Sequence, residues 1–373
     1  YQSTPDKHFL PDYAKVSTDQ IKKNILRSSI WTTNSKIFSQ VMGFSTTLVL
    51  ARLLSREDFG LMAMVLFYIG IIDTFIDLGF LNAIIQAETI SSKQLSSSFW
   101  LLLGLSFFVS LITILVSPYI AHAFSDIRLE NLIIYLAPIL LFAPLNIVCK
   151  GILSRDLKLD ILAKIELFAG IIKMIVSISL AIIGMGVMSL LIGYLLERSL
   201  LSISASIASK WIPKFEYDNK SIRHLYSFGS QTTLSSILWY IYTKADVFII
   251  GRLLGAEILG IYSIALQFPQ TLTRLIPATW HRIAFPLFSR YKNSDHLKQI
   301  VLKSSYQLAL VSLPLFIGIS AVAPDIITVL FSSKWHAAIF PMQILAIVAA
   351  IETINGLLPI VLNSIGRPGV NIV

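Results

Sequence analysis

The sequence predicts an all-helical protein that crosses a membrane many times. Hydrophobic residues make up 55% of the 373 residues and charged residues only 14%, whereas a soluble domain carries about 25% charged residues. The mean hydropathy is +0.74. Apolar segments recur along the chain, each near the roughly 20 residues that a membrane-spanning helix needs. We therefore expect ten transmembrane helices, in two pseudo-symmetric bundles.

The first bundle is expected over residues 25–209. Residues 1–24 are polar and are interpreted as a cytoplasmic tail, with a short surface helix around Val16 to Lys23. Pro118 is expected to close the third helix, and Pro138 and Pro144 to bend the fourth, because proline lacks the N–H that a helix interior uses. The six expected helices cover residues 26–54, 59–87, 97–116, 129–153, 161–183 and 186–208.

The second bundle is expected over residues 224–373, after a basic cytoplasmic linker at 210–223. Residues 324–332 predict a short interfacial helix, and Trp335 is expected to anchor the chain at the level of the lipid head groups. The four expected helices cover residues 225–254, 258–288, 301–322 and 339–365.

One stretch of ten residues occurs twice and relates the two bundles. Residues 51–60 read ARLLSREDFG, and residues 251–260 read GRLLGAEILG. Each copy joins the end of one apolar segment to the start of the next, which indicates two similar halves, although a chance match between two ordinary turns is the alternative. In the first copy Ser55 is expected to cap the next helix. Gly60 and Gly260 are expected to allow a neighbouring helix to approach closely.

The distribution of basic residues predicts the orientation. With the N-terminus in the cytoplasm, the inner connections are rich in lysine and arginine, as membrane proteins prefer. The outer connections hold only Arg52, Arg56, Arg128, Arg252 and Lys334. The formal net charge of +9 is thereby explained without a nucleic-acid partner.

Sequence motifs for catalysis are absent from this chain. It contains no P-loop, no HExxH and no GxSxG. The single cysteine, Cys149, lies inside an apolar segment, so neither a disulfide framework nor a cysteine-rich metal site is expected. Every connection is short and leaves no room for a soluble catalytic domain. We expect a protein that is not an enzyme and has no catalytic residue, metal or cofactor.

Charged residues inside the apolar segments mark the candidate site. Each costs about 2.5–3.5 kcal/mol at the centre of a spanning helix, so it should face the protein interior or a wet cavity. Asp73 and Asp77 lie four residues apart and share one helix face. Glu197 and Arg198 are adjacent, so they point to different faces and need separate partners. The other deep charges are Lys36, Glu166, Lys173, Lys244, Asp246, Arg274 and Glu352.

Two interpretations of these charges remain open. In the first, the charges line an aqueous cleft, where the cations hold an anionic head group and the acids balance the cations or carry a coupling ion. In the second, the charges form internal ion pairs that only fix helix packing. The aromatic residues Trp239, Tyr240 and Tyr242 are similarly ambiguous. They can stack on sugar rings, but Trp and Tyr also populate membrane interfaces.

Three stretches resemble a known family. Residues 48–60, 77–80 (DLGF) and 244–255 (KADVFIIGRLLG) resemble polysaccharide flippases of the multidrug/oligosaccharidyl-lipid/polysaccharide exporter superfamily, above all the polysaccharide-transporter branch that includes colanic-acid-type exporters. The resemblance implies two bundles arranged as a V with the substrate path between them. Relatives usually have twelve or fourteen helices, so the ten seen here imply a chain truncated after the tenth.

The resemblance also implies a substrate and a mechanism. The substrate is an oligosaccharide linked to undecaprenyl pyrophosphate, moved by alternating access from the inner to the outer leaflet of the bacterial cytoplasmic membrane. Coupling to a proton or sodium ion and a polysaccharide polymerase complex as partner are further expectations. The residues expected to hold the pyrophosphate are Lys36, Lys173, Lys244 and Arg274, and those expected to couple the ion are Asp73, Asp77 and Glu352.

Three other functions remain as alternatives. A drug or cation antiporter of the same superfamily predicts a cleft dominated by acids. A membrane enzyme that assembles lipid-linked glycans predicts a large outer loop with catalytic residues, and this sequence has none. A non-enzymatic partner of a glycan synthesis complex is separated from a flippase only by a transport assay.

Overall fold

The computed structural model describes residues 8–9, 18–87, 89–290 and 296–364. Among them, eight helical stretches are long and apolar enough to cross a membrane. This confirms an all-helical protein with many membrane spans. The eight stretches are Arg56–Asp77, Ser92–Phe124, Arg128–Arg155, Leu159–Ile182, Val187–Ser209, Ser236–Thr273, Leu297–Phe331 and Ser333–Asn355.

The structure differs from the expected spans where the seventh and eighth were expected. Helix α1, Thr18–Leu53, covers the expected first span, and Ile37–Leu53 is the apolar stretch among its described residues. The expected seventh and eighth helices are joined in α9, Asn219–Arg290, which is kinked at Gly255. Gly255 has φ 80° and ψ 178°, a backbone conformation that only glycine adopts without strain. The break expected between residues 254 and 258 is thus a kink at one residue.

Prolines change the helix type in one span and leave another unbroken. Around Pro138 and Pro144, the chain passes from α5, Arg128–Leu136, through the 3₁₀ helix η2, Ala137–Phe142, into α6, Ala143–Arg155. The expectation that Pro118 closes its helix is wrong, because α4 runs from Ser92 to Phe124. Pro118 cannot bond to the carbonyl oxygen of Ile114, one turn back. The Ser117 hydroxyl donates to that oxygen instead, at 2.8 Å.

The expected second span is broken near its end. Helix α2, Arg56–Asp77, stops at Leu78 and Gly79, both with positive φ, and α3 covers Phe80–Gln86. The Asp77 carboxylate accepts a hydrogen bond from the Leu81 N–H at 3.2 Å, so it stabilises the start of α3. The adjacent strand β2, Ile90–Ser91, pairs antiparallel with β1, His8–Phe9, which lies in the expected tail.

By packing, the described chain divides into two compact units. Unit 1 comprises residues 1–46 and 61–255, and unit 2 comprises residues 47–60 and 256–373. The chain therefore passes from one unit to the other three times. Packing and sequence repeats are different properties, so the pseudo-symmetric bundles at 25–209 and 224–373, with a linker at 210–223, stay a prediction.

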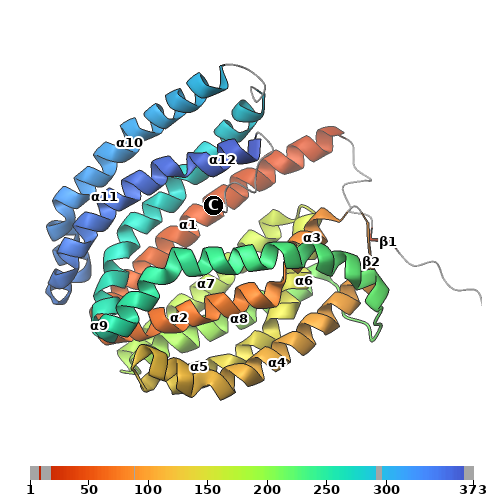
Figure 1. Cartoon of the computed structure of the whole chain (residues 1–373), viewed down its shortest axis with the longest axis horizontal. Helices are drawn as coiled ribbons and strands as arrows, with labels where there is room; N and C mark the ends of the chain where they lie inside the picture. The colour runs from red at the N-terminus through yellow and green to blue at the C-terminus, as the bar shows by residue number, and fades with distance from the viewer. Residues whose placement is uncertain (1–7, 10–17, 88, 291–295, 365–373) are drawn as a thin grey trace, which may run out of the picture. The chain divides into compact units, whose positions relative to one another are not determined.

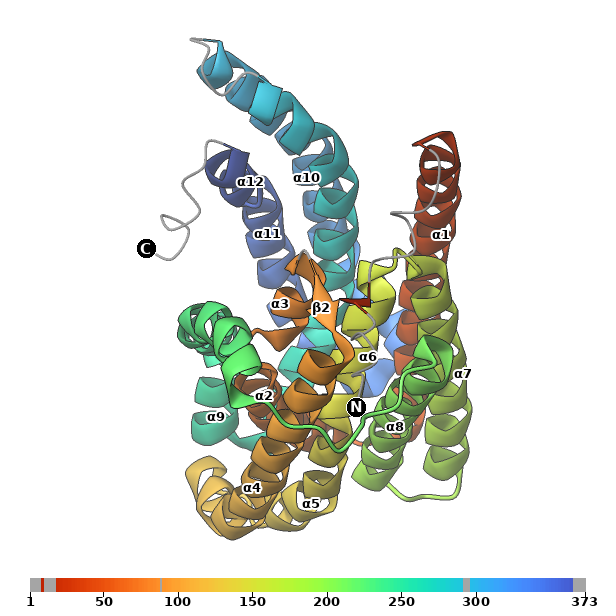
Figure 2. The same cartoon turned by 90° about the vertical axis from the view of Figure 1, so that its right-hand side faces the viewer.

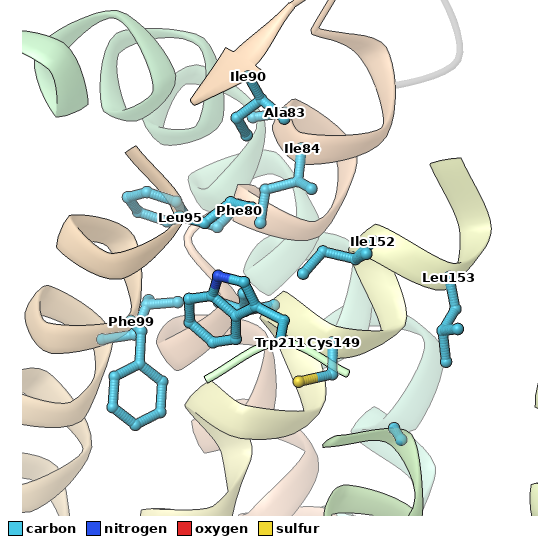
Figure 3. Packing of buried hydrophobic residues seen from close by; sticks show 13 residues of the cluster. Phe80, Ala83, Ile84, Ile90, Leu95, Phe99, Cys149, Ile152, Leu153 and Trp211 are labelled. Carbon is cyan, nitrogen blue, oxygen red and sulfur yellow. The ribbon is translucent and has the colours of Figure 1, made fainter. Parts of the chain in front are cut away.

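Unit 1 contains α2 from residue 61 onward and helices α3 to α8, and it has a large apolar cluster. Helices α7, Leu159–Ile182, and α8, Val187–Ser209, pack side by side (Figures 1 and 2). The cluster gathers residues from α3, β2, α4, α6 and α8, and the indole of Trp211 lies among them (Figure 3). Cys149 belongs to this cluster and is buried.

Unit 2 contains helices from α10 onward and encloses the tryptophan that was expected at the membrane surface. Trp335 is fully buried, its Nε1–H donates to the carbonyl oxygen of Ala51 at 2.8 Å, and its ring meets Phe59 edge-on. The expectation of a head-group anchor is therefore wrong for this residue. Helix α10, Leu297–Ile326, continues into the π-helix η3, Ile327–Phe331, where a separate interfacial helix was expected.

The remaining elements of unit 2 follow in order. A 3₁₀ helix, η4, covers Ser333–Ala338, and α11 covers Ile339–Asn355. Helix α12, Leu357–Ser364, completes the described chain. Helices α10 and α11 lie side by side (Figure 1).

Candidate functional site

Two ion pairs inside the membrane spans of unit 1 form the candidate site, which we call the charge network. It consists of Asp73 on α2, Lys173 on α7, and Tyr194, Glu197 and Arg198 on α8. Each ion pair joins different helices. Spanning segments rarely hold such charges without a functional or structural partner.

The first pair is built by a helical spacing on α8. Tyr194 and Arg198 lie four residues apart and share one face. The Arg198 Nε–H donates to the Tyr194 hydroxyl at 2.9 Å, and the guanidinium lies 5.4 Å from the centre of the Tyr194 ring. Its Nη2–H donates to the Asp73 carboxylate. Tyr194 therefore orients the guanidinium toward α2.

The second pair joins α7 to α8. The Lys173 ammonium donates to the Glu197 carboxylate at 2.7 Å. The helices are close here because Gly193 has no side chain: a Cβ at this position would lie 1.9 Å from the Ser177 hydroxyl. Glu197 and Arg198 thus have separate partners on separate helices, which confirms the expectation from their adjacency.

A small cavity lies beside the first pair. It measures about 20 Å³ as the space open to the centre of a water molecule, and one water needs about 10–15 Å³ on that measure. The polar part of its lining comes from Asp73, Asn146, Tyr194, Arg198 and Ser202. The lining residues are Ile69, Asp73, Ile139, Leu140, Phe142, Ala143, Asn146, Tyr194, Arg198 and Ser202.

The charge network is accessible as well as paired. The side chain of Arg198 remains 38% exposed, and that of Lys173 is exposed to the same fraction. An arginine fork is suited to bidentate contact with phosphate as well as with carboxylate.

The other expected site residues lie in different places. Asp77 holds the break between α2 and α3, as described above, and Lys244 is half-buried on α9 within unit 1. Glu352 is exposed on α11 in unit 2. Lys36 and Arg274 lie in α1 and α9, but their side chains are outside the part of the structure that is described. Of the expected site residues, Asp73 and Lys173 thus each pair with a residue of α8.

Sequence reasoning did not assign the residues that connect them. Glu197 and Arg198 were recognised as deep charges but given no role, and Tyr194 and Asn146 were not singled out. The spacing of Tyr194 and Arg198 was a usable signal, because it places a hydrogen-bonding group one turn from the guanidinium.

The three aromatic residues of α9 separate into two groups. The Tyr240 hydroxyl donates to the Leu66 carbonyl oxygen at 3.2 Å, and Gly70 leaves room for its ring. Trp239 and Tyr242 are exposed and lie 5.8 Å apart, measured between ring centres. Tyr240 is therefore a packing residue, whereas the other two remain open to a partner.

No group of three or more His, Cys, Asp and Glu side chains is placed to hold a metal ion among the residues that the structure describes.

The eight long apolar helical stretches define a polytopic helical membrane protein. A solved structure titled "Lipid II flippase MurJ, inward closed conformation" matches with a TM-score of 0.76 at 16% identity, over 92% of this chain and 78% of that one. A multidrug resistance MATE family transporter, inward-facing, matches with a TM-score of 0.67 at 16% identity, over 90% of this chain and 82% of that one.

The chain belongs to the family of polysaccharide biosynthesis proteins, whose family model matches residues 49–340. The teichuronic acid biosynthesis protein TuaB of Bacillus subtilis is 31% identical over 75% of this chain. The lipopolysaccharide biosynthesis protein WzxC of Escherichia coli is 25% identical over 90% of this chain. The alignments span 58% of TuaB and 69% of WzxC.

Proposed function

We propose that the chain acts as a flippase for an oligosaccharide linked to undecaprenyl pyrophosphate. It moves this lipid from the inner to the outer leaflet of the bacterial cytoplasmic membrane, for the synthesis of a surface polysaccharide such as capsule, exopolysaccharide or O-antigen. The observation that carries the proposal is the partly exposed Arg198–Asp73 pair within membrane spans of a polysaccharide biosynthesis family member. The N-terminus lies in the cytoplasm, in accord with the basic inner connections.

Transfer of a pyrophosphate through a membrane requires cations along the path. An unpaired buried charge is strongly unfavourable, so the head group must exchange its water for hydrogen bonds from the protein. Arg198 supplies several N–H donors in one plane. Without substrate these donors bind Asp73, and they exchange the Asp73 carboxylate for a phosphate oxygen when the head group binds. Lys173 is the second described cation of the network, and Lys36, Lys244 and Arg274 are further candidates. The polyprenyl tail stays in the lipid.

Movement of the head group is coupled to alternating access. When Arg198 binds phosphate, Asp73 loses its cation and favours uptake of a proton or sodium ion, which links substrate binding to an ion gradient. Asp77 and Glu352 are additional candidates for ion coupling. The protein performs no covalent chemistry, needs no cofactor, and hands its product to a polysaccharide polymerase complex.

Reconstitution into vesicles tests the proposal directly. The vesicles contain an undecaprenyl pyrophosphate-linked oligosaccharide, and a membrane-impermeant reagent measures how fast sugar from the inner leaflet becomes accessible outside. Arg198→Gln should slow translocation by about tenfold to a hundredfold, as expected for one lost charge-assisted hydrogen bond of about 1.5–3 kcal/mol. Arg128→Gln is the matched control, because Arg128 pairs with Asp126 at an exposed turn.

A second variant separates transport from folding. Asp73→Asn combined with Arg198→Gln removes both charges and leaves neither unpaired, so the protein should fold and yet translocate slowly. Normal translocation by this double variant would refute the assignment of Arg198. Movement of a cationic dye without movement of the glycan lipid would instead support the antiporter alternative.

A further inference from the structure

The segment between α8 and α9, residues 210–218, lies along the first turns of α4; we call it the strap (Figure 2). Its second residue, Trp211, is buried in the apolar cluster of unit 1. In contrast to Trp211, the apolar side chains that follow are exposed. Ile212 is 80% exposed and Phe215 is 92% exposed, and Tyr217 is also exposed. A segment with little regular structure thus presents an apolar outer face.

Serines of α4 hold the strap in place. The Ser96 hydroxyl accepts a hydrogen bond from the Lys214 N–H at 3.1 Å. The Ser97 hydroxyl accepts from the Asp218 N–H at 3.0 Å and donates to the Glu216 carbonyl oxygen at 3.3 Å. Both serines are fully buried. They satisfy the backbone of the strap, and this explains why polar residues occupy the beginning of an apolar spanning helix.

An aromatic contact fixes the outer face of the strap. The Trp100 Nε1–H donates to the Lys214 carbonyl oxygen at 2.7 Å, and the Trp100 and Phe215 rings stack with their centres 4.6 Å apart. The strap is therefore held at both ends and in its middle. Because its backbone is fixed, the exposure of Ile212 and Phe215 is a property of the folded protein.

The depth of the strap matches the membrane interface. Helix α4 has 33 residues and is about 50 Å long at 1.5 Å per residue, so it exceeds the roughly 30 Å hydrocarbon core. Trp100 lies eight residues after the first residue of α4, or about 12 Å along the helix. The strap thus runs beside the part of α4 that passes the head-group layer, where Trp and other amphipathic side chains are favoured.

A small excess of positive charge accompanies the apolar face. Lys210, Lys214 and Glu216 are exposed on the strap, and Lys93 at the start of α4 lies 3.6 Å from the Asp218 carboxylate. The strap and Lys93 together hold three lysines and two acids, so their net charge is +1. With the N-terminus in the cytoplasm, as proposed above, the strap lies at the cytoplasmic leaflet. Lysines beside exposed apolar groups at that surface are suited to acidic phospholipids.

We propose that the strap binds the head groups of acidic phospholipids in the cytoplasmic leaflet. Ile212 and Phe215 insert at the boundary between head groups and acyl chains, and Lys210 and Lys214 contact the phosphates. This lipid site is distinct from the charge network, and it anchors unit 1 at a fixed depth whatever substrate the protein moves.

Depth-dependent quenching tests the insertion. In a Cys149→Ser background, Ile212→Cys and Phe215→Cys each receive an environment-sensitive label, and the protein is reconstituted in vesicles. Spin-labelled lipids with the quencher near the head group should quench both labels, whereas aqueous iodide should not. Glu216→Cys is the matched control on the same strap and should be quenched by iodide. Quenching of all three labels by iodide alone would overturn the proposal.

Lipid selectivity tests the partner. The ratio of phosphatidylglycerol to phosphatidylcholine retained by the purified protein is measured by native mass spectrometry after exposure to equal amounts of both. Lys210→Gln and Lys214→Gln should each lower this ratio by about fivefold, the effect expected for one lysine at an acidic surface. Arg128→Gln, at an exposed turn that the proposed topology puts on the outer side, should leave it unchanged. An unchanged ratio in the strap variants would exclude acidic head groups as the partner.

Discussion

Gly60 and Gly260, which hold the same place in the two copies of the repeated sequence, pack against each other in unit 2. A Cβ on Gly60 would lie 1.7 Å from the carbonyl oxygen of Ala256, and one on Gly260 would lie 1.8 Å from that of Arg56 and 3.1 Å from the Gly60 nitrogen. The close approach expected of both glycines is confirmed. The repeat thus joins its own two copies at one helix contact.

Alanine at either glycine should destabilise the protein. A methyl group that would overlap a backbone carbonyl forces the two helices apart, and overpacking of this kind costs about 1–3 kcal/mol. Thermal unfolding of detergent-solubilised Gly60→Ala and Gly260→Ala should begin at clearly lower temperature than in the parent protein. Gly104→Ala is the control, since nothing lies within 4 Å of a Cβ there; it should be neutral or more stable by up to about 1 kcal/mol. Equal behaviour of all three variants would contradict the close contact.

Trp335 should contribute through both its ring and its hydrogen bond. Trp335→Ala removes a fully buried side chain and is expected to cost about 3–5 kcal/mol. Trp335→Phe keeps most of the ring but leaves the Ala51 carbonyl oxygen without its donor, at a cost of about 1–3 kcal/mol. Denaturation midpoints of the two variants give these values. Trp239→Phe on the exposed face of α9 should change stability little, and a smaller effect at Trp335 than at Trp239 would rule out the buried site.

Arg56 should matter more than its acidic partner. Its guanidinium pairs with Glu257 at 2.8 Å and also donates to the Lys334 carbonyl oxygen. The pair with Glu257 is largely exposed, so a double-mutant cycle with alanine should give a coupling energy of only about 0.2–1 kcal/mol. Arg56→Ala alone should destabilise more than Glu257→Ala, because it also leaves a carbonyl oxygen without a partner. A larger loss of stability in Glu257→Ala than in Arg56→Ala would show that the hydrogen bond to the Lys334 carbonyl oxygen does not add to the stability.

Exchange of charges should preserve the contact between α7 and α8. Lys173→Glu places two carboxylates together and should lower the unfolding temperature, whereas Lys173→Glu with Glu197→Lys should restore most of it. The coupling energy is expected to be about 1 kcal/mol, since both side chains are partly exposed. The exposed pair Lys164–Asp160 serves for comparison and should give about 0.3–0.5 kcal/mol. No recovery in the exchanged variant would mean that the pair does not hold these helices together.

Local patterns in the sequence predicted the parts of the structure that depend on neighbouring residues. Ser55 caps α2 as expected: its hydroxyl accepts from the Asp58 N–H at 3.1 Å, and the Asp58 carboxylate accepts from the Ser55 N–H at 2.8 Å. The separate partners of Glu197 and Arg198 follow from the 100° turn between adjacent helical residues. These features need no knowledge of distant segments.

Features that depend on distant segments were not predictable in the same way. The sequence around Trp335 is typical of an interfacial residue, but the residue is buried against Ala51, 284 positions earlier, and Phe59. Pro118 remains inside a helix because Ser117 replaces the missing donor. The partner of Arg198 is on α2, and nothing in the sequence around Asp73 identifies which cation it meets.

The three passages of the chain between the units have a consequence for how such a protein can be divided. A gene cut within the strap would encode one polypeptide that lacks residues 219–255 of unit 1 and carries residues 47–60 of unit 2. Neither of the two polypeptides would contain all the residues of unit 1 or of unit 2. Recombination between relatives at this point would therefore exchange interlocked fragments, and two co-expressed pieces would have to assemble before either could reach its native packing.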